Sequence, residues 1–273
     1  MSPSTAAVTS ADGTAIAYRR TGSGPALLVV PGNNRRAHNY DALAAALADA
    51  FTVCVIERRG RGESGPQGAE YSLAREVQDL QAVAGAEGAA RVFGHSYGGL
   101  VTLAAAAADP GLGRCAVFEP AVSIGGSFDL SFRGEFMRLL GEGKHVRAMA
   151  LFLHRTGVLP FRNPPYPVCW ALAALMVGRP GEMRELMATT PAELEVVARA
   201  DGDGAAYGAI AADILLLSGT KTSPALTGVL DPLARIIPRA THRVLAGADH
   251  NAPDESDPTR IAEELRGFFA APA

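Results

Sequence analysis

The chain has 273 residues, of which 48% are hydrophobic and 19% are charged, and its formal net charge is −3. A chain of this length can bury a sizeable core, and its mildly acidic balance excludes the strongly basic class of nucleic-acid-binding proteins. The opening residues lack a cationic and apolar leader, and the apolar runs are far shorter than the ~18 residues of a membrane span. We therefore expect a cytoplasmic protein with no membrane partner.

Strand and helix patterns alternate through the first part of the chain. Short apolar runs bounded by turn residues predict strands, and the first of them alternates polar and apolar residues like an edge strand. The expected strands cover residues 14–20, 26–30, 51–56, 90–94 and 114–118. Apolar residues at helical spacing predict helices over residues 40–50, 72–84 and 97–108. Ser72 is the expected N-cap of the second helix.

The alternation then stops, and residues 122–208 hold only helix-like segments. Strand patterns return over 213–218 and 242–246, and a last helix is expected from about 257 to 270. Strands that alternate with helices predict an α/β fold with a mostly parallel, doubly wound sheet. We expect a core formed by 1–121 and 209–273, with residues 122–208 inserted as a helical cap.

Residues 94–98 read Gly-His-Ser-Tyr-Gly and follow a predicted strand, with a predicted helix directly after them. This pattern is typical of a nucleophilic serine on a strained strand-to-helix turn, where the glycines let strand and helix approach closely. The turn directs the backbone N–H of Tyr97 toward a developing oxyanion. Ser96 is therefore the candidate nucleophile, and the alternative is a tight turn without chemistry.

A serine nucleophile needs a base, and six histidines are available. His95 adjoins Ser96 and should point elsewhere, whereas His145 and His154 fall in the helical insertion. His250 follows the last predicted strand, on a loop at the carboxyl edge of the sheet, where catalytic loops collect. We therefore take His250 as the candidate base.

Several short segments resemble motifs of the α/β-hydrolase superfamily and occur in its order along the chain. They are PGNN at 31–34, ERRGRGES at 57–64, GHSYGG at 94–99, FEP at 118–120 and GADH at 247–250. The resemblance implies an α/β-hydrolase fold with a helical cap and no cofactor. It also implies that the backbone N–H of Asn33 is the second oxyanion-hole donor, with Asn34 as the alternative. A serine at the turn argues against the aspartate-dependent dehalogenases and epoxide hydrolases of this superfamily.

The acid of the predicted triad does not lie at the position that is commonest in the superfamily. That position follows strand 213–218, where residues 218–224 contain no carboxylate. Glu119 ends the preceding strand, 114–118, and a carboxylate at the end of a buried strand is unusual. Glu119 is the favoured acid because some α/β-hydrolases take their acid from this strand. Asp231 is the alternative, and a degenerate site without an acid is the third possibility.

Other features carry less information. GRGESG at 60–65 matches a dinucleotide-binding pattern, but it is followed by loop residues and predicts a loop. Nearby arginines predict a solvated rim paired with Glu57 or Glu63, or else contacts to an acidic substrate; they are Arg35, Arg36, Arg58, Arg59 and Arg61. Apolar residues of the insertion should partly line a pocket; they are Phe132, Phe136, Met137, Met149, Phe152, Trp170 and Met176. We expect no metal site, and buried reduced thiols at Cys54, Cys115 and Cys169.

The expected function is cofactor-independent hydrolysis of an ester-like bond (a carboxylic ester, lactone or thioester) in an apolar or aromatic small molecule. Ser96 would form an acyl-enzyme, with His250 as base and Glu119 as its orienting acid. Two alternatives stay open. One is a biosynthetic C–C hydrolase, lyase or cyclase that uses the same site, and the other is a non-catalytic small-molecule binder on the same scaffold.

Overall fold

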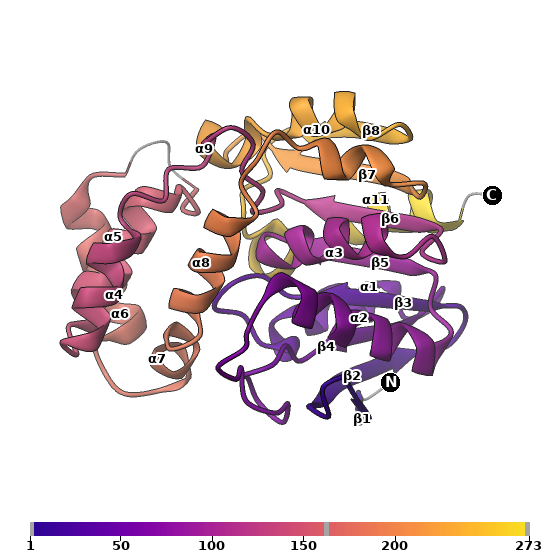
Figure 1. Ribbon diagram of the computed structural model, residues 1–273, viewed down its shortest axis with the longest axis horizontal. Coiled ribbons are helices and arrows are strands. Elements are labelled where there is room, and N and C mark those ends of the chain that lie inside the picture. Colours follow the sequence, from indigo (N-terminus) through magenta and orange to yellow (C-terminus); the bar gives the residue numbers. More distant parts are fainter. Residues whose placement is uncertain (1–2, 161–163, 271–273) are drawn as a thin grey trace.

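The computed structural model describes residues 3–160 and 164–270, and an eight-stranded mixed sheet lies at its centre (Figure 1). The strand order is β1-β2-β4-β3-β5-β6-β7-β8. The strands are β1 (Ser4–Thr9), β2 (Ala15–Gly22), β3 (Ala26–Val30), β4 (Thr52–Ile56), β5 (Arg91–His95), β6 (Arg114–Phe118), β7 (Asp213–Gly219) and β8 (Ala240–Leu245). Strands β3 to β8 are parallel, whereas β1 and β2 pair in antiparallel fashion. The predicted α/β fold class is confirmed.

The sequence predicts an edge strand over residues 14–20. This segment does form a strand, but the prediction that it lies at the edge of the sheet is wrong. β2 covers this segment but pairs with β1 on one side and with β4 on the other. The edge is β1, whose side chains are mostly serine, threonine and alanine and mostly exposed. Because β1 is held by backbone hydrogen bonds and buries little apolar surface, it leaves no hydrophobic pattern in the sequence.

Apolar side chains alternate between the two faces of the sheet. In β3, Leu28 and Val30 belong to one core, and Leu27 and Val29 belong to the other, as the two-residue period of a strand requires. The first face is covered by α2 (Leu73–Glu87), α3 (Tyr97–Ala108) and α10 (Leu230–Ile236). The second face is covered by α1 (Asp41–Leu47) and α11 (Pro258–Ala270).

The helices between β6 and β7 form a separate layer beyond one end of the sheet, which we call the helical cluster (Figure 1, left). They are α4 (Arg133–Gly141), α5 (His145–Thr156), α6 (Tyr166–Val177), α7 (Glu182–Met187) and α8 (Thr190–Arg199). Helices α4, α5 and α6 share a core of their own, and α8 lies between them and the sheet (Figure 1). The division into a core of 1–121 and 209–273 and a cap of 122–208 stays a prediction.

Several local expectations agree with the structure. The hydroxyl of Ser72 accepts the Arg75 N–H at the start of α2, so the predicted N-cap is confirmed. Cys54, Cys115 and Cys169 are buried and free. Among the helices in the described part of the chain, none combines the length and apolar character that a membrane span requires.

Strand β5 and helix α3 approach the neighbouring backbone so closely that two positions exclude a side chain. A Cβ on Gly98 would lie 2.0 Å from the carbonyl oxygen of Val30, and one on Gly94 would lie 2.4 Å from the carbonyl oxygen of Gly98. Both contacts are with backbone, which cannot rotate aside as a side chain can. These glycines therefore allow the turn that carries Ser96.

Replacing Gly98 with alanine should lower the free energy of unfolding by about 1–3 kcal/mol, because the added methyl group overlaps the backbone of β3. Urea denaturation followed by circular dichroism measures this change. Gly85→Ala is the matched control, since Gly85 lies in α2 with open space around it. That alanine should stabilise the protein by about 0.5–1 kcal/mol. Equal stability of the two variants would contradict the prediction.

Candidate active site

Ser96 lies on the turn between β5 and α3 in a strained backbone conformation. Its φ of 53° and ψ of −119° fall outside the regions that L-residues favour. Among the described residues, the non-glycine positions with positive φ are Asn34, Ser96 and Glu119. Such conformations cost about 1–3 kcal/mol each and cluster at functional sites. Each of the three is a residue that the sequence singled out for the site.

Glu119 and His250 form a buried hydrogen-bonded pair. Glu119 directly follows β6 and is 0% exposed, and His250 follows β8 on the loop that leads to α11. The His250 Nδ1–H donates to Oε2 of Glu119 at 2.7 Å, and Oε1 accepts the Gly219 N–H at 2.8 Å. Because the carboxylate holds the ring proton on Nδ1, Nε2 is left as the proton acceptor. His250 and Ser96 line the same cavity.

Asp231, the alternative acid, and Asp249, the residue before His250, have other partners. Asp231 accepts a hydrogen bond from Nδ1 of His242 at 3.0 Å, and its side chain is 77% exposed. The Asp249 carboxylate accepts the Asn251 N–H at 2.9 Å. The end of β7 supplies a backbone donor to Glu119, the Gly219 N–H, in place of an acid. The structure therefore brings Glu119, and neither aspartate, to His250.

A second serine–histidine–aspartate set occurs between β7 and β8. Oγ of Ser218 lies 2.9 Å from Nε2 of His242, whose Nδ1 is bound to Asp231. Ser218 is 2% exposed and lies inside β7, between β6 and β8. A substrate could reach its hydroxyl only by displacing the side chains that cover this face of the sheet, and the ion pair to the exposed Asp231 is screened by water. We do not regard this set as an active site.

His95 links the loop of His250 to the loop after β3. Its Nε2–H donates to the carbonyl oxygen of His250 at 2.8 Å, so Nδ1 accepts from the Tyr40 hydroxyl at 2.7 Å. The Tyr40 oxygen in turn accepts the Gly32 N–H at 3.0 Å. Burial, and then the neighbouring His250, hold the pKa of His95 well below its usual value. His95 is therefore a neutral residue that positions the two loops, a role that its place beside Ser96 did not indicate.

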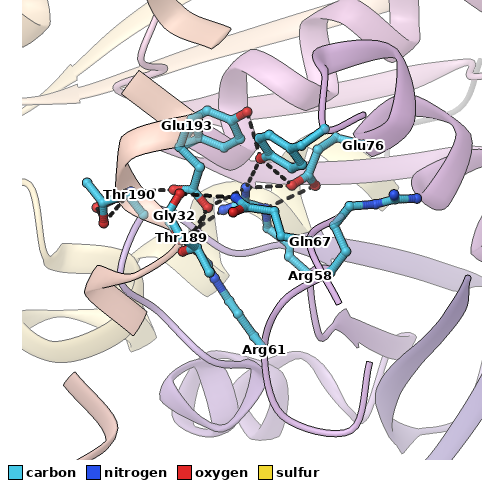
Figure 2. Close-up of polar contacts among 12 residues, drawn as sticks. Gly32, Arg58, Arg61, Gln67, Glu76, Thr189, Thr190 and Glu193 are labelled. Carbon is cyan, nitrogen blue, oxygen red and sulfur yellow. Dashed lines mark hydrogen bonds and ion pairs between the residues drawn. The ribbon is translucent and has the colours of Figure 1, made fainter. Parts of the chain in front are cut away.

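Four buried charged residues lie behind the loop after β3, and we call them the buried charge cluster. They are Arg58, Arg61, Glu76 and Glu193 (Figure 2). Nη2 of Arg58 donates to Glu76 at 2.6 Å and to Glu193 at 2.9 Å, and Arg61 also donates to Glu193. Burial alone would lower the pKa of Arg58, but Glu193 and Glu76 outweigh it and raise that pKa well above its usual value. Two positive and two negative charges thus neutralise one another.

The prediction that these loop arginines form a solvated rim is wrong for three of them. Arg58, Arg59 and Arg61 are buried. Arg59 pairs with Asp79 at 2.7 Å, in place of the expected glutamates. Their acidic partners come from the turn between β1 and β2, from α2 and from α8. These segments are distant in sequence, so the charge pattern of the loop alone could not identify them. Arg36 does pair with Glu57, at 2.8 Å.

The buried charge cluster orients the peptide between Gly32 and Asn33. Nη1 of Arg61 donates to the Gly32 carbonyl oxygen at 2.9 Å, and Nη1 of Arg58 lies 3.4 Å from the same oxygen. In a trans peptide the C=O and the following N–H point in opposite directions, so the Asn33 N–H is directed away from the arginines. Asn33 also lines the cavity with Ser96. By holding the Gly32 carbonyl oxygen, the cluster therefore orients the Asn33 N–H, the predicted oxyanion-hole donor.

Tyr97 begins α3, and its backbone N–H is one of the first in that helix, which have no acceptor within the helix. Its side chain is buried, with the guanidinium of Arg58 4.3 Å from the ring centre and its hydroxyl 2.9 Å from that of Tyr71. Only the backbone of Tyr97 is thus available to an oxyanion.

The cavity beside Ser96 has a volume of about 270 Å³ and a largely apolar roof. Three of the aromatic and methionine side chains predicted to line a pocket do so: Met149, Phe152 and Met176. Phe132 and Phe136 instead pack inside the helical cluster, while Met137 and Trp170 are exposed.

Within the described residues, no group of three or more histidine, cysteine, aspartate or glutamate side chains could hold a metal ion. GRGESG forms a loop between β4 and α2.

The fold is that of the α/β hydrolases. The model of the alpha/beta hydrolase family matches residues 27–264, and the chain therefore belongs to this family. An alpha/beta hydrolase from Sphaerobacter thermophilus DSM 20745 is 32% identical, and the match covers 97% of this chain and 100% of that one with a TM-score of 0.82. An esterase from Rhodococcus sp. ECU1013 shares the fold at 24% identity, with 99% of each chain covered and a TM-score of 0.72.

Curated relatives match over shorter regions. The N-formylmaleamate deformylase of Pseudomonas putida is 37% identical over 110 residues, which is 38% of this chain and 41% of the deformylase. Uncharacterised proteins of Mycobacterium tuberculosis and Mycobacterium bovis are 36% identical over 90 residues. The match to these mycobacterial relatives covers 26% of their length and 32% of this chain. Together the comparisons support a hydrolase.

Glu193→Gln should lower the free energy of unfolding by about 3–5 kcal/mol, because it leaves two buried arginines facing the single carboxylate of Glu76. Glu195→Gln is the control on the same helix. Glu195 pairs with Arg133 and Arg199 near the surface, so this change should stay within about 0.5 kcal/mol. Urea denaturation measures both variants, and a small effect at Glu193 would show that the buried charges contribute little to stability.

Proposed function

We propose that the protein is a cofactor-independent serine hydrolase that cleaves an ester-like bond of an apolar or aromatic small molecule through an acyl-enzyme. The bond is a carboxylic ester, a lactone or a thioester. The observation that carries the proposal is the 2.7 Å hydrogen bond between His250 and Glu119 beside the cavity that Ser96 lines. Membership of the alpha/beta hydrolase family supports the reaction class.

In the first step, Ser96 attacks the carbonyl carbon of the substrate. Nε2 of His250 takes the hydroxyl proton as the Oγ–C bond forms, and Glu119 stabilises the resulting imidazolium without accepting its proton. Negative charge develops on the former carbonyl oxygen. The backbone N–H groups of Asn33 and Tyr97 donate to this oxyanion, and the N-terminus of α3 favours it further.

The tetrahedral intermediate then collapses, and the bond to the leaving group breaks. The leaving oxygen or sulfur takes the proton from Nε2 of His250, and Ser96 is left acylated. Water attacks the acyl-enzyme as His250 takes its proton. Collapse of this second intermediate releases the carboxylic acid and returns the proton to Oγ of Ser96. No cofactor or metal enters any step.

We also propose that the protein works in the cytoplasm, as the sequence predicts. The free, buried thiols of Cys54, Cys115 and Cys169 support a reducing compartment, since secreted proteins tend to pair their cysteines.

A fluorophosphonate probe tests the nucleophile. Intact-mass spectrometry should find one adduct on the wild type and none on Ser96→Ala, because only a serine activated by a base reacts with the probe. An adduct that persists on Ser96→Ala would move the active serine elsewhere, with Ser218 as the first candidate. Absence of any adduct on the folded wild type would contradict the serine-hydrolase mechanism.

Glu119→Gln should lower kcat for an ester substrate by about 10³–10⁴-fold. The amide oxygen can still accept the Gly219 N–H, but the amide nitrogen favours the wrong tautomer of His250. Asp231→Asn should leave kcat nearly unchanged, since Asp231 contacts His242. Steady-state kinetics of both variants, with circular dichroism to verify folding, decide between them. The reverse pattern would remove Glu119 from the triad.

A further inference from the structure

Ser96 lies where two cavities meet. The larger one, of about 270 Å³, is lined by His250 and not by Tyr97. The smaller one, of about 40 Å³, is lined by Tyr97 and not by His250. The residues that line both cavities are Asn33, Ser96, Phe152 and Val158. The predicted nucleophile and oxyanion loop thus face both spaces, but the predicted base faces one of them.

The proposed chemistry determines which part of a substrate enters each space. After attack, the reacting carbon carries Oγ of Ser96, the oxyanion, the leaving group and the acyl substituent. The leaving group needs a proton from His250, so it must lie on the side of the larger cavity. The oxyanion is directed to the N–H groups of Asn33 and Tyr97. The acyl substituent then takes the remaining direction, away from His250 and toward the smaller cavity.

Resting on the proposed function, we infer that the smaller cavity is an acyl pocket that restricts the enzyme to short acyl groups, from acetyl to butyryl. Its volume of about 40 Å³ is roughly a seventh of the 270 Å³ of the larger cavity. Butyryl places three carbon atoms beyond its carbonyl carbon in this smaller space, whereas hexanoyl places five. The leaving group occupies the larger cavity and can be bulky or aromatic.

The lining of the acyl pocket favours a hydrocarbon chain. Phe128, Val197 and Leu226 contribute apolar surface and are themselves buried. Besides the nucleophile Ser96, the polar side chains of this lining already have partners. The Asn33 amide donates to Glu193, and the Tyr97 hydroxyl lies 2.9 Å from that of Tyr71. The Thr156 hydroxyl donates to the Phe152 carbonyl oxygen at 2.7 Å, and the Glu193 carboxylate is neutralised by the arginines of the buried charge cluster. A polar acyl group would lose its hydration in this pocket without gaining a free partner.

A series of p-nitrophenyl esters tests the assignment, because the leaving group stays constant while the acyl chain grows. The wild type should cleave the acetate and the butyrate with kcat/KM at least ~10-fold above the hexanoate and octanoate, since a chain that exceeds its pocket is rejected by about this factor. Leu226→Ala should raise the ratio of hexanoate to acetate kcat/KM at least ~10-fold by lengthening the pocket.

Leu153→Ala is the matched control. Leu153 is as buried as Leu226, at 4% and 3% exposed, but it lines only the larger cavity, so its truncation should leave the acyl-chain ratio unchanged. Val197→Ala, a smaller truncation in the acyl pocket, should shift the ratio in the same direction and replaces Leu226→Ala if that variant does not fold.

Three outcomes would overturn the proposals. A wild type that cleaves the hexanoate as well as the acetate would overturn the acyl-pocket assignment. So would a chain-length shift in Leu153→Ala together with none in Leu226→Ala and Val197→Ala, because the acyl group would then lie in the larger cavity. No ester turnover together with no fluorophosphonate adduct would instead overturn the proposed function itself.

Discussion

The two oxygens of one buried carboxylate hold together three segments of the chain at the carboxyl edge of the sheet. Glu119 follows β6, accepts the Gly219 N–H at the end of β7, and accepts the ring N–H of His250 after β8. A buried carboxylate is costly unless each oxygen has a donor, so the three segments can come together only in an arrangement that supplies both donors. This constraint determines the position of His250 and the tautomer of its ring. The proposed chemistry depends on that tautomer.

The loop after β3 is fixed at Gly32 from two sides. Its N–H donates to Tyr40, which leads through His95 to the backbone of His250, while its C=O accepts from Arg61 of the buried charge cluster. Glu193 brings α8 into that cluster, so the orientation of the predicted oxyanion donor depends on a helix of the helical cluster. Helix α8 and the loop after β3 are therefore joined through one hydrogen-bonded assembly. We expect a change in the packing of α8 to alter that loop as well.

Much of the fold could be predicted because its elements leave local signals. The bounds of β3, α3 and β6 agree with those predicted from continuous apolar runs and from the glycine and proline residues that flank them. β1 could not be predicted, because an exposed edge strand of small polar residues has no hydrophobic period. The burial of the arginines after β4 could not be predicted for a related reason. Their charge is visible in the sequence, but burial depends on partners 18 to 135 residues away, such as Glu76 and Glu193.

The sequence by itself determined the candidate nucleophile and base. A strained turn needs glycines at fixed spacing around Ser96, and a loop after the last strand carries His250 to the edge where that turn lies. It also narrowed the acid to two residues, but only the tertiary structure placed Glu119 against His250 and Asp231 against His242. The positioning role of His95, the buried charge cluster and the two cavities beside Ser96 were likewise decided in three dimensions. Each depends on side chains from segments that are distant in sequence, and no local pattern encodes which of them meet.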